Sequence, residues 1–352
     1  MKGRIMQKKM MWLAGLVLGA TMIGGCASSD GPKIGVLLPE KYNTPDGMVL
    51  GSDGYIYLNI PNYNDDSYDA KVLRISPKNQ ISEVVTLPRH PDTGKCGPLG
   101  IDIGADGNLY IADNQSMCGF NDYKSRLLRV NMKDGRAVDV EVLVTGFLQA
   151  NAVSCHGDSV YVTETSLDLE ADPMPSGVYR FRYFEFNGTP IELKPNAADD
   201  HLLLKFTTSN PDWRVGANGL GFSKDGKLYV CNFGEASLLE YTLNTDGSVK
   251  SNRVVAQGNG MESTDGLKVC DKTGAVYIAD FLGNAVHKVN PQTGTVTTIC
   301  QNENNSGGVD GLLDKPSEVC LRGNKIYVAN IDLPFDDNEY DELHTISVID
   351  RK

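Results

Sequence analysis

Short apolar runs separated by turn residues make up almost the whole chain after residue 30, and they recur with a period near fifty residues. Each unit begins with a small residue or proline and an Asx-Gly-like pair. It continues through an apolar run and a turn, and ends in an apolar-Tyr-apolar-small pattern followed by an acid or amide. The shared tyrosines are Tyr57, Tyr110, Tyr161, Tyr229, Tyr277 and Tyr327. Their spacings are 53, 51, 68, 48 and 50 residues, and the long spacing contains an insertion around residues 184–200. Six units of one kind predict a repeat fold.

Each unit predicts four strands, of which the first two are joined by a short Asp-Gly, Gly-Asp or Gly-Asn turn typical of a hairpin. A third strand follows in all six units, but a fourth follows in only five. The missing strand is available at the other end of the chain as KIGVLLP, Lys33–Pro39. The sequence therefore predicts an all-β, six-bladed β-propeller of four-stranded blades over residues 33–352. The N-terminal strand completes the last blade, beside 296–300 or 344–350, and leaves no long exposed sheet edge.

The first 25 residues have the pattern of an export signal. Basic residues are followed by an uncharged stretch, Met10–Gly25, that is short for a membrane span and fits the apolar region of a signal peptide. The stretch leads into IGGC, which resembles the lipobox of bacterial lipoproteins and implies lipid attachment at Cys26. We predict a signal peptide at 1–25, a lipidated tether at 26–32 and a place in the cell envelope, periplasmic or on an outer surface, with the lipid anchoring the chain to a membrane. The alternative is an ordinary secretory signal with an incidental cysteine.

Composition narrows the function classes. The formal net charge is −12 and no basic stripe is present, so a nucleic-acid partner is not expected. An acidic surface attracts cations instead. Seven cysteines follow Cys26, and export would permit disulfides. Cys96 and Cys118 lie in turn-rich loops and could pair, whereas four of the others lie in apolar strands, where cysteine packs as a small hydrophobic residue.

Aligned on their tyrosines, the six units share a position at the start of the innermost strand. Its residues, which we call the mouth ring, are Asp46, Leu99, Asn151, Asn218, Asp265 and Ser317, the last followed by Glu318. Because innermost strands surround the central channel of a propeller, the Asp and Asn side chains could converge at its mouth. Two carboxylates and two amide oxygens suit Ca²⁺, and the lack of His and Cys in the ring argues against zinc or copper. The alternative is ordinary turn chemistry, in which each Asx side chain caps its own backbone.

The loops between second and third strands are predicted to lie at the same end of the ring, and they are rich in acids. The loop of the last blade carries Asp336, Asp337, Glu339, Asp341 and Glu342. We expect most of these residues to keep the loops solvated while they raise the local cation concentration.

The repeats resemble the gluconolactonase/regucalcin family of calcium-dependent six-bladed propellers, over nearly the whole chain and most strongly over 215–300. GANGLGFSKDGKLYV is similar to the family's Asn-Gly-Leu segment, which implies Asn218 as a metal ligand. STDGLKVCDKTGAVYIAD is similar to its Asp-Gly segment, which implies Asp265 as a metal ligand with a part in catalysis. QANAV matches more loosely and implies Asn151, while Asp46 in PDGM stands where the family usually has a longer glutamate. Other segments, such as SGGVDGLLDKPSEVCL, resemble NHL-repeat propellers, many of which only bind partners.

The sequence leaves two functions open. The first is a calcium-dependent hydrolase of a lactone or other small ester at the channel mouth, in which Asp265 binds the metal and takes a proton from water or orients that water. Glu318 is the alternative base. The second is a non-catalytic envelope propeller that binds a sugar, peptide or protein on its acidic face. A serine hydrolase is not expected, because no Gly-x-Ser-x-Gly segment is present. The histidines, His156 among them, are predicted to lie in turns or outer strands.

Overall fold

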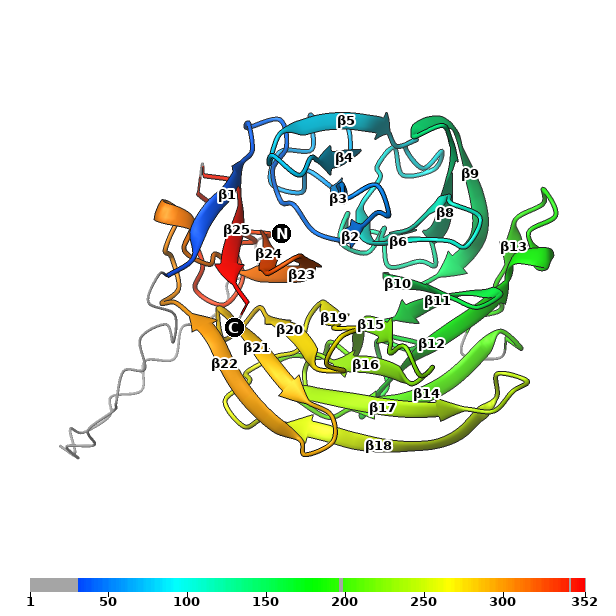
Figure 1. The fold of residues 1–352 in the computed structure, drawn as a ribbon. Helices are drawn as coiled ribbons and strands as arrows, with labels where there is room; N and C mark the ends of the chain where they lie inside the picture. The colour runs from blue at the N-terminus through cyan, green and yellow to red at the C-terminus, as the bar shows by residue number, and fades with distance from the viewer. Residues whose placement is uncertain (1–30, 196–198, 342, 352) are drawn as a thin grey trace, which may run out of the picture.

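The strands of this chain form six sheets arranged as a ring (Figure 1). The computed structural model describes residues 31–195, 199–341 and 343–351. Over these residues, no helix has the length and apolar character needed to cross a membrane. The predicted signal peptide and the lipidation site at Cys26 lie outside the described residues.

Each blade is a run of antiparallel strands that begins at the centre of the ring and ends at its edge. Blade 1 holds β2 (Met48–Leu50), β3 (Ile56–Ile60), β4 (Lys71–Ile75) and β5 (Ile81–Thr86). Blade 2 holds β6 (Pro98–Ile103), β7 (Leu109–Asp113), β8 (Ser125–Lys133) and β9 (Arg136–Phe147). Blade 3 holds β10 (Ala150–His156), β11 (Ser159–Glu164), β12 (Met174–Arg182) and β14 (Leu202–Thr208).

The second half of the chain repeats this arrangement. Blade 4 holds β15 (Ala217–Phe222), β16 (Leu228–Asn232), β17 (Ser237–Leu243) and β18 (Val249–Gln257). Blade 5 holds β19 (Leu267–Val269), β20 (Val276–Asp280), β21 (Ala285–Asn290) and β22 (Thr295–Gln301). Blade 6 holds β23 (Pro316–Arg322), β24 (Lys325–Asn330), β25 (Thr345–Asp350) and the N-terminal β1 (Lys33–Leu37).

Blade 6 closes the ring with strands from both ends of the chain. β1 pairs antiparallel with β25, so that Lys33 lies opposite Val348 and Leu37 lies opposite Thr345. The predicted closure is confirmed, and of the two proposed partners the 344–350 segment is the correct one. Val36 of β1 is buried in a cluster that also contains residues of blades 1 and 6, so closure buries apolar surface as well as pairing a sheet edge.

The insertion in the third unit adds a strand that the repeat pattern did not predict. β13 (Ile191–Glu192) pairs in parallel with β9, so blade 2 has five strands. A short 3₁₀ helix, η1 (Tyr183–Glu185), precedes it, and a second one, η2 (Val309–Gly311), leads into blade 6. The buried Leu193 donates its backbone N–H to Thr145 O at 3.0 Å, an ordinary distance for a hydrogen bond between strands. The insertion therefore ties blade 3 to the edge of blade 2.

The inner strands of neighbouring blades approach so closely that the Asx-Gly pairs have a packing role. A Cβ atom on Gly219 would lie 2.4 Å from Asp265 O, and one on Gly266 would lie 2.5 Å from Ser317 O. In blade 5, Asp265 N–H donates to Ala279 O (2.8 Å) while Ala279 N–H donates to Gly266 O (2.9 Å). Two residues therefore oppose one, which is a β-bulge. A bulge re-aims side chains, and here it precedes the first strand of the blade.

Candidate functional site

Four Asx residues of the predicted mouth ring occupy equivalent places in their blades. Asn151 and Asn218 lie near the start of β10 and β15, where the pairing with the next strand shifts register. Asp46 and Asp265 lie just before β2 and β19. The side chains of Asp46 and Asn218 are buried, and those of Asn151 and Asp265 are half-buried.

Asp265 is surrounded by other acids. Burial raises the pKa of its carboxyl well above the ordinary value, and the charges of Asp46 and Glu318 raise it further. A side-chain interaction with Asn218 opposes this rise without cancelling it. The structure thus brings together three of the predicted ligands, Asp46, Asn218 and Asp265. Asn151 lies at the same position of its blade, and its part as a ligand stays a prediction.

Glu318 joins this group from blade 6. A Cβ atom on Gly266 would lie only 2.6 Å from Glu318 Oε1, so the carboxylate rests against the backbone next to Asp265. Its Oε1 accepts a hydrogen bond from Val319 N at 2.8 Å. Burial raises the pKa of Glu318 to about 8, because desolvation and the charge of Asp46 outweigh that bond and the nearby Lys268. Burial likewise raises the pKa of Asp46 to about 6.

These side chains fit a hard divalent cation. The charges of Asp46 and Glu318 raise the pKa of Asp265, and that of Asp46 raises the pKa of Glu318, so the three carboxylates lie near one another. Amide side chains are the other oxygen donors of the ring. Burying like charges together is costly unless a cation or protons compensate. The donor set contains neither His nor Cys, as Ca²⁺ prefers. Asp46, Asn218, Asp265 and Glu318 are therefore candidate ligands, and they offer oxygen atoms alone.

A cavity of about 460 Å³ lies along the channel and is lined by residues from the innermost strands of all six blades. Glu318 lines this cavity, together with the charged side chains of Asp102 and Lys268. The Asp102 carboxylate is fixed by the N–H groups of Ile103 (2.8 Å) and Cys155 (2.7 Å). Burial alone would lower the pKa of Lys268, but the charges of Asp102 and Glu318 raise it. Lys268 is therefore a cation inside the channel.

Sequence reasoning missed Asp102 and Lys268, although the repeats contain a signal for them. Each lies three residues after a mouth-ring position, where the other units have Val49, Ser154, Gly221 and Cys320. A lone acid and a lone lysine among small or apolar residues mark channel-facing positions with a different role. Extending the alignment by three residues would have found them.

His156 also lines the channel cavity, which corrects its predicted place in a turn. It is the last residue of β10, and its ring stacks on Phe222 with centroids 4.1 Å apart and planes 6° apart. Burial lowers the pKa of its imidazole, so the neutral form is favoured. The prediction failed because the first strand of blade 3 extends further than its apolar run.

An apolar cluster lies on the loops at the mouth end of the channel. Its members are Phe233, Phe281, Leu282, Ile331 and Leu333, with the half-buried Tyr63, Trp213 and Val215 packed against them. Phe233, Phe281 and Ile331 each directly follow the second strand of a blade, so they lie beside the start of the first strands. These residues help to explain why the acids of the mouth are so strongly desolvated.

Cys96 and Cys118 do come together, at the wall of a pocket of about 110 Å³. Both are free thiols in the structure, so the predicted disulfide is not formed there. Burial raises the pKa of both thiols, that of Cys118 to about 12, so neither is activated as a thiolate. Their pairing stays a prediction for the chain under oxidising conditions.

One comparison with known protein families covers two blades of this ring. The family described as "SMP-30/Gluconolactonase/LRE-like region" matches residues 205–304. The matched segment contains blades 4 and 5 with Asn218 and Asp265, so the predicted resemblance is confirmed where it was strongest. A search of curated proteins found no significant match.

Solved structures share the fold of this chain at low identity. A gluconolactonase from Xanthomonas campestris is 15% identical, with a TM-score of 0.55 over 93% of this chain and 96% of its own. A luciferin-regenerating enzyme is 16% identical, with a TM-score of 0.59 over 90% and 94%. A PQQ-bound aldose sugar dehydrogenase from Streptomyces coelicolor is 12% identical, with a TM-score of 0.57 over 90% and 97%. Because one fold carries such different chemistries, the function must be argued from the site.

Proposed function

We propose that this protein is a calcium-dependent hydrolase of a lactone or other small ester. The observation that carries the proposal is the grouping of the buried Asp46 with the half-buried Asp265 and Glu318 at the start of the inner strands, where the charges of Asp46 and Glu318 raise the pKa of Asp265. Such a cluster is costly as a structural feature and useful as a cation site. The SMP-30/gluconolactonase/LRE-like match over residues 205–304, which include Asn218 and Asp265, supports the choice of reaction class.

In this proposal, Asp46, Asn151, Asn218 and Asp265 hold Ca²⁺. When bound, the ion supplies Lewis-acid polarisation of the substrate carbonyl and stabilises the developing oxyanion. Asp265 accepts the proton of the attacking water or orients that water. Asn218, which interacts with the Asp265 side chain, positions that carboxylate.

Glu318 competes with Asp265 for the role of base. It is the member of the mouth group that also lines the channel cavity, and its pKa of about 8 suits proton transfer near neutral pH. Lys268 and Asp102 face the same cavity and would bind hydroxyl groups of a substrate. This combination favours a polar, sugar-like lactone over a purely apolar ester.

The decisive experiment is a calcium titration of hydrolysis with a panel of sugar lactones and aryl esters. Asp265→Asn keeps an oxygen ligand but loses the charge and the proton acceptor, so kcat should fall about 10²–10⁴-fold while some calcium affinity remains. Asn218→Ala should weaken calcium binding, and added calcium should partly restore its rate. Glu318→Gln is the matched control, since it also removes one carboxylate of the group.

The outcomes separate the assignments. If Glu318→Gln loses the larger factor and Asp265→Asn behaves like Asn218→Ala, Glu318 is the base and Asp265 only a ligand. If wild-type protein hydrolyses nothing in the panel with calcium present, the hydrolase proposal is wrong. The protein would then be the alternative, an NHL-like propeller that binds a sugar, peptide or protein partner.

We also infer that lipid at Cys26 anchors the protein to a membrane of the cell envelope. The support is the signal-like sequence before it and the IGGC segment. Cys26→Ser should leave the folded propeller in the soluble fraction. Retention of this variant on membranes after a high-salt wash would show that lipid is not the anchor.

A further inference from the structure

A second group of acids lies in blade 6, apart from the mouth ring. One carboxylate oxygen from each of Asp314, Asp332 and Asp341 lies within 4.8 Å of the other two. Asp314 precedes β23, whereas Asp332 and Asp341 lie in the loop between β24 and β25. Asp314 and Asp332 are buried and Asp341 is half-buried, so the group is reached by solvent from one side.

Asp314 is the member that a structural role does not explain. Its side chain is 1% exposed, and neither carboxylate oxygen has a hydrogen-bond partner. A buried carboxylate without donors loses hydration and gains nothing in return, which ordinarily costs several kcal/mol. Its ligand oxygen is directed into the group formed with Asp332 and Asp341. Asp314 therefore offers two unpartnered oxygens to a ligand of this group.

The other two acids are held in orientations that suit a ligand. Asp332 Oδ1 accepts a hydrogen bond from Asn338 Nδ2 at 3.0 Å, and its Oδ2 accepts one from Asp341 N at 2.9 Å. The Asn338 Oδ1 atom is itself buried without a partner and is a further oxygen beside the group. A Cβ atom on Gly307 would lie 3.0 Å from Asp341 Oδ2, so another loop packs against the third acid. Such outer contacts fix ligand geometry in metal sites.

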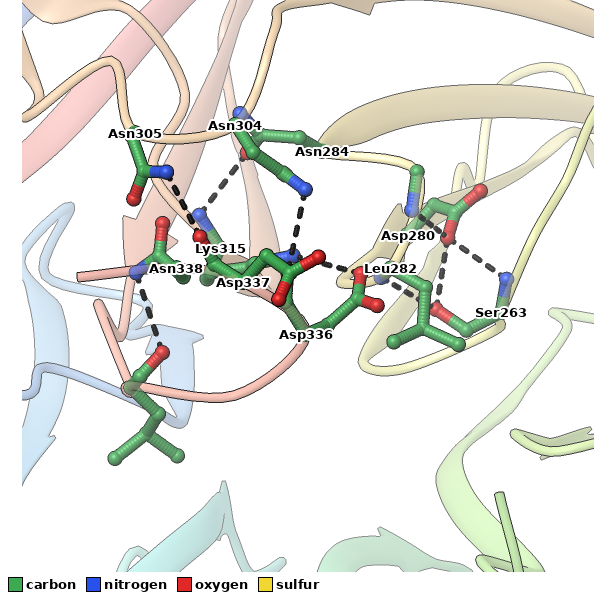
Figure 2. Close-up of polar contacts among 12 residues, drawn as sticks. Ser263, Asp280, Leu282, Asn284, Asn304, Asn305, Lys315, Asp336, Asp337 and Asn338 are labelled. Atoms are coloured by element: carbon green, nitrogen blue, oxygen red, sulfur yellow. Dashed lines mark hydrogen bonds and ion pairs between the residues drawn. The ribbon is translucent and has the colours of Figure 1, made fainter. Parts of the chain in front are cut away.

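Lys315, the residue after Asp314, lowers the pKa of Asp314 by its charge but makes its side-chain hydrogen bond outside this group. Lys315 is buried, but its Nζ bonds to Asp336 Oδ2 at 3.2 Å and lies 5.1 Å from the centre of the Phe281 ring. Figure 2 shows Lys315 directed at Asp336, with Asn304 and Asn305 beside Asp336 and Asp337 of the same loop. Lys315 thus holds the β24–β25 loop at Asp336, and the same loop meets Asp314 through Asp332 and Asp341.

We propose that Asp314, Asp332 and Asp341 form a second cation site, which takes a divalent ion of the Ca²⁺ class and fastens the 331–344 loop to the start of β23. The all-oxygen donor set excludes soft metals, and the half-exposed side leaves room for the waters that complete a Ca²⁺ shell. Two of the ligands are already adjacent in the backbone, because Asp332 N–H donates to Asp314 O at 3.3 Å. The ion adds a crosslink from that ladder to Asp341, close to β25.

The site is independent of the proposed catalytic centre, and its test should be run with that centre disabled. In the full chain carrying Asp265→Ala and Asn218→Ala, which remove both ligand side chains, about one equivalent of Ca²⁺ should still bind in equilibrium dialysis. Calcium should raise the Tm of this protein by a few degrees and protect the 331–344 loop from proteolysis. Adding Asp314→Asn should abolish the bound equivalent, the Tm shift and the protection.

A matched control is Asp337→Asn, which removes one acid from the same loop outside the group and should leave all three readouts unchanged. Misfolding is a small risk, because Asp314→Asn removes an unpartnered buried charge and should melt at the same or a higher temperature without calcium. The alternative to a bound ion is that Asp314, Asp332 and Asp341 are partly protonated and share hydrogen bonds among themselves. Failure of the disabled chain to bind calcium, or an unchanged Tm shift in Asp314→Asn, would establish that arrangement and overturn the proposal.

Discussion

Asp265 and Asp280 lie on adjacent segments of blade 5, yet their surroundings have opposite effects on their charge. The Asp265 N–H donates to Ala279 O at 2.8 Å, so the two aspartates are separated by one step of the ladder. Desolvation raises the pKa of both carboxyls. The net pKa of Asp280 is nevertheless lowered, while that of Asp265 is raised well above its ordinary value. Burial alone therefore does not separate a structural acid from a functional one.

The difference lies in the donors around each carboxylate. Asp280 accepts hydrogen bonds from the backbone N–H groups of Glu262 (2.8 Å), Ser263 (2.8 Å) and Gly283 (3.0 Å). The Ser263 hydroxyl also donates to it at 2.7 Å, and His287 Nε2 lies 3.0 Å away. Asp265 instead faces Asp46 and Glu318. A carboxylate that accepts many hydrogen bonds is stabilised in its charged form and fixes the loop that donates them. A carboxylate surrounded by other acids is destabilised in its charged form unless a cation binds.

Other strand-end residues share this hydrogen-bonding pattern, although burial still raises the pKa of Glu164 to about 8. In blades 2, 3 and 6, as in blade 5, the residue at the end of the second strand accepts a backbone N–H from the loop that leads into its own blade. These bonds run from Gly97 N to Asp113 (2.7 Å), from Leu148 N to Glu164 (2.9 Å) and from Asp314 N to Asn330 (3.1 Å). The repeat therefore contains two polar positions with different roles, one at the end of the second strand and one at the mouth ring. The strand-end position is structural, and the mouth position is the functional candidate.

The strongest test of this comparison is to remove each aspartate in turn. Asp280→Ala leaves several buried N–H donors and His287 without their hydrogen-bond acceptor, so we expect the free energy of unfolding to fall by about 3–5 kcal/mol. Asp265→Ala in metal-free protein should cost far less, since it relieves repulsion from Asp46 and Glu318. Urea denaturation in the presence of a chelator measures both. Equal losses in the two variants would remove the distinction.

The pH dependence of stability should have opposite signs for the two kinds of acid. Burial raises the pKa of Asp46 from 3.8 to about 6, so in metal-free protein its contribution is full below pH 4 and is lost as pH rises to about 6. By linkage, a shift of this size corresponds to about 3 kcal/mol. The pKa of Asp280 is lowered, so its contribution is present above pH 4 and is lost as pH falls further.

Asp46→Asn isolates the first effect. In this variant, the part of the fall in stability between pH 4 and pH 6 that comes from Asp46 should disappear. The loss of stability below pH 4 that Asp280 produces should remain. Chemical denaturation at several pH values with a chelator present measures both. If stability falls between pH 4 and pH 6 as much in Asp46→Asn as in the wild-type protein, the mouth acids do not titrate in the way their burial implies.

The sequence predicts the fold well because the information is local and repeated. Each unit carries its own turn, tyrosine and apolar runs, and the count of fourth strands alone places β1 in blade 6. Register then predicts the mouth ring, because equivalent residues of repeated blades occupy equivalent positions. The strand β13 was not predictable in this way, since its insertion has no counterpart in the other units.

The chemical difference between equivalent-looking acids is not local, and this is why the sequence did not separate them. The donors of Asp280 come from the loop at 262–263 and the turn at 283, and their orientation depends on the fold. Asp341 looked like one of several solvated acids, and only its approach to Asp314 and Asp332 gives it a distinct role. Each case requires residues from separate segments to meet.

The smallest expected effect concerns one donor to Asp280. Figure 2 shows the Ser263 hydroxyl between Asp280 and Leu282, where it donates to Asp280 Oδ1 (2.7 Å) and accepts from Leu282 N (3.0 Å). Because a hydrogen bond to a charged group is worth about 1.5–3 kcal/mol, Ser263→Ala should lower the free energy of unfolding by that amount. Thr264→Val is the matched control, since the adjacent hydroxyl contacts the neutral carbonyls of Asn232 and Ser237 (both 3.1 Å), and its loss should cost about 0.5–1.5 kcal/mol. If Ser263→Ala costs no more than Thr264→Val, the backbone N–H groups and His287 suffice to keep Asp280 charged, and the hydroxyl is only a spacer.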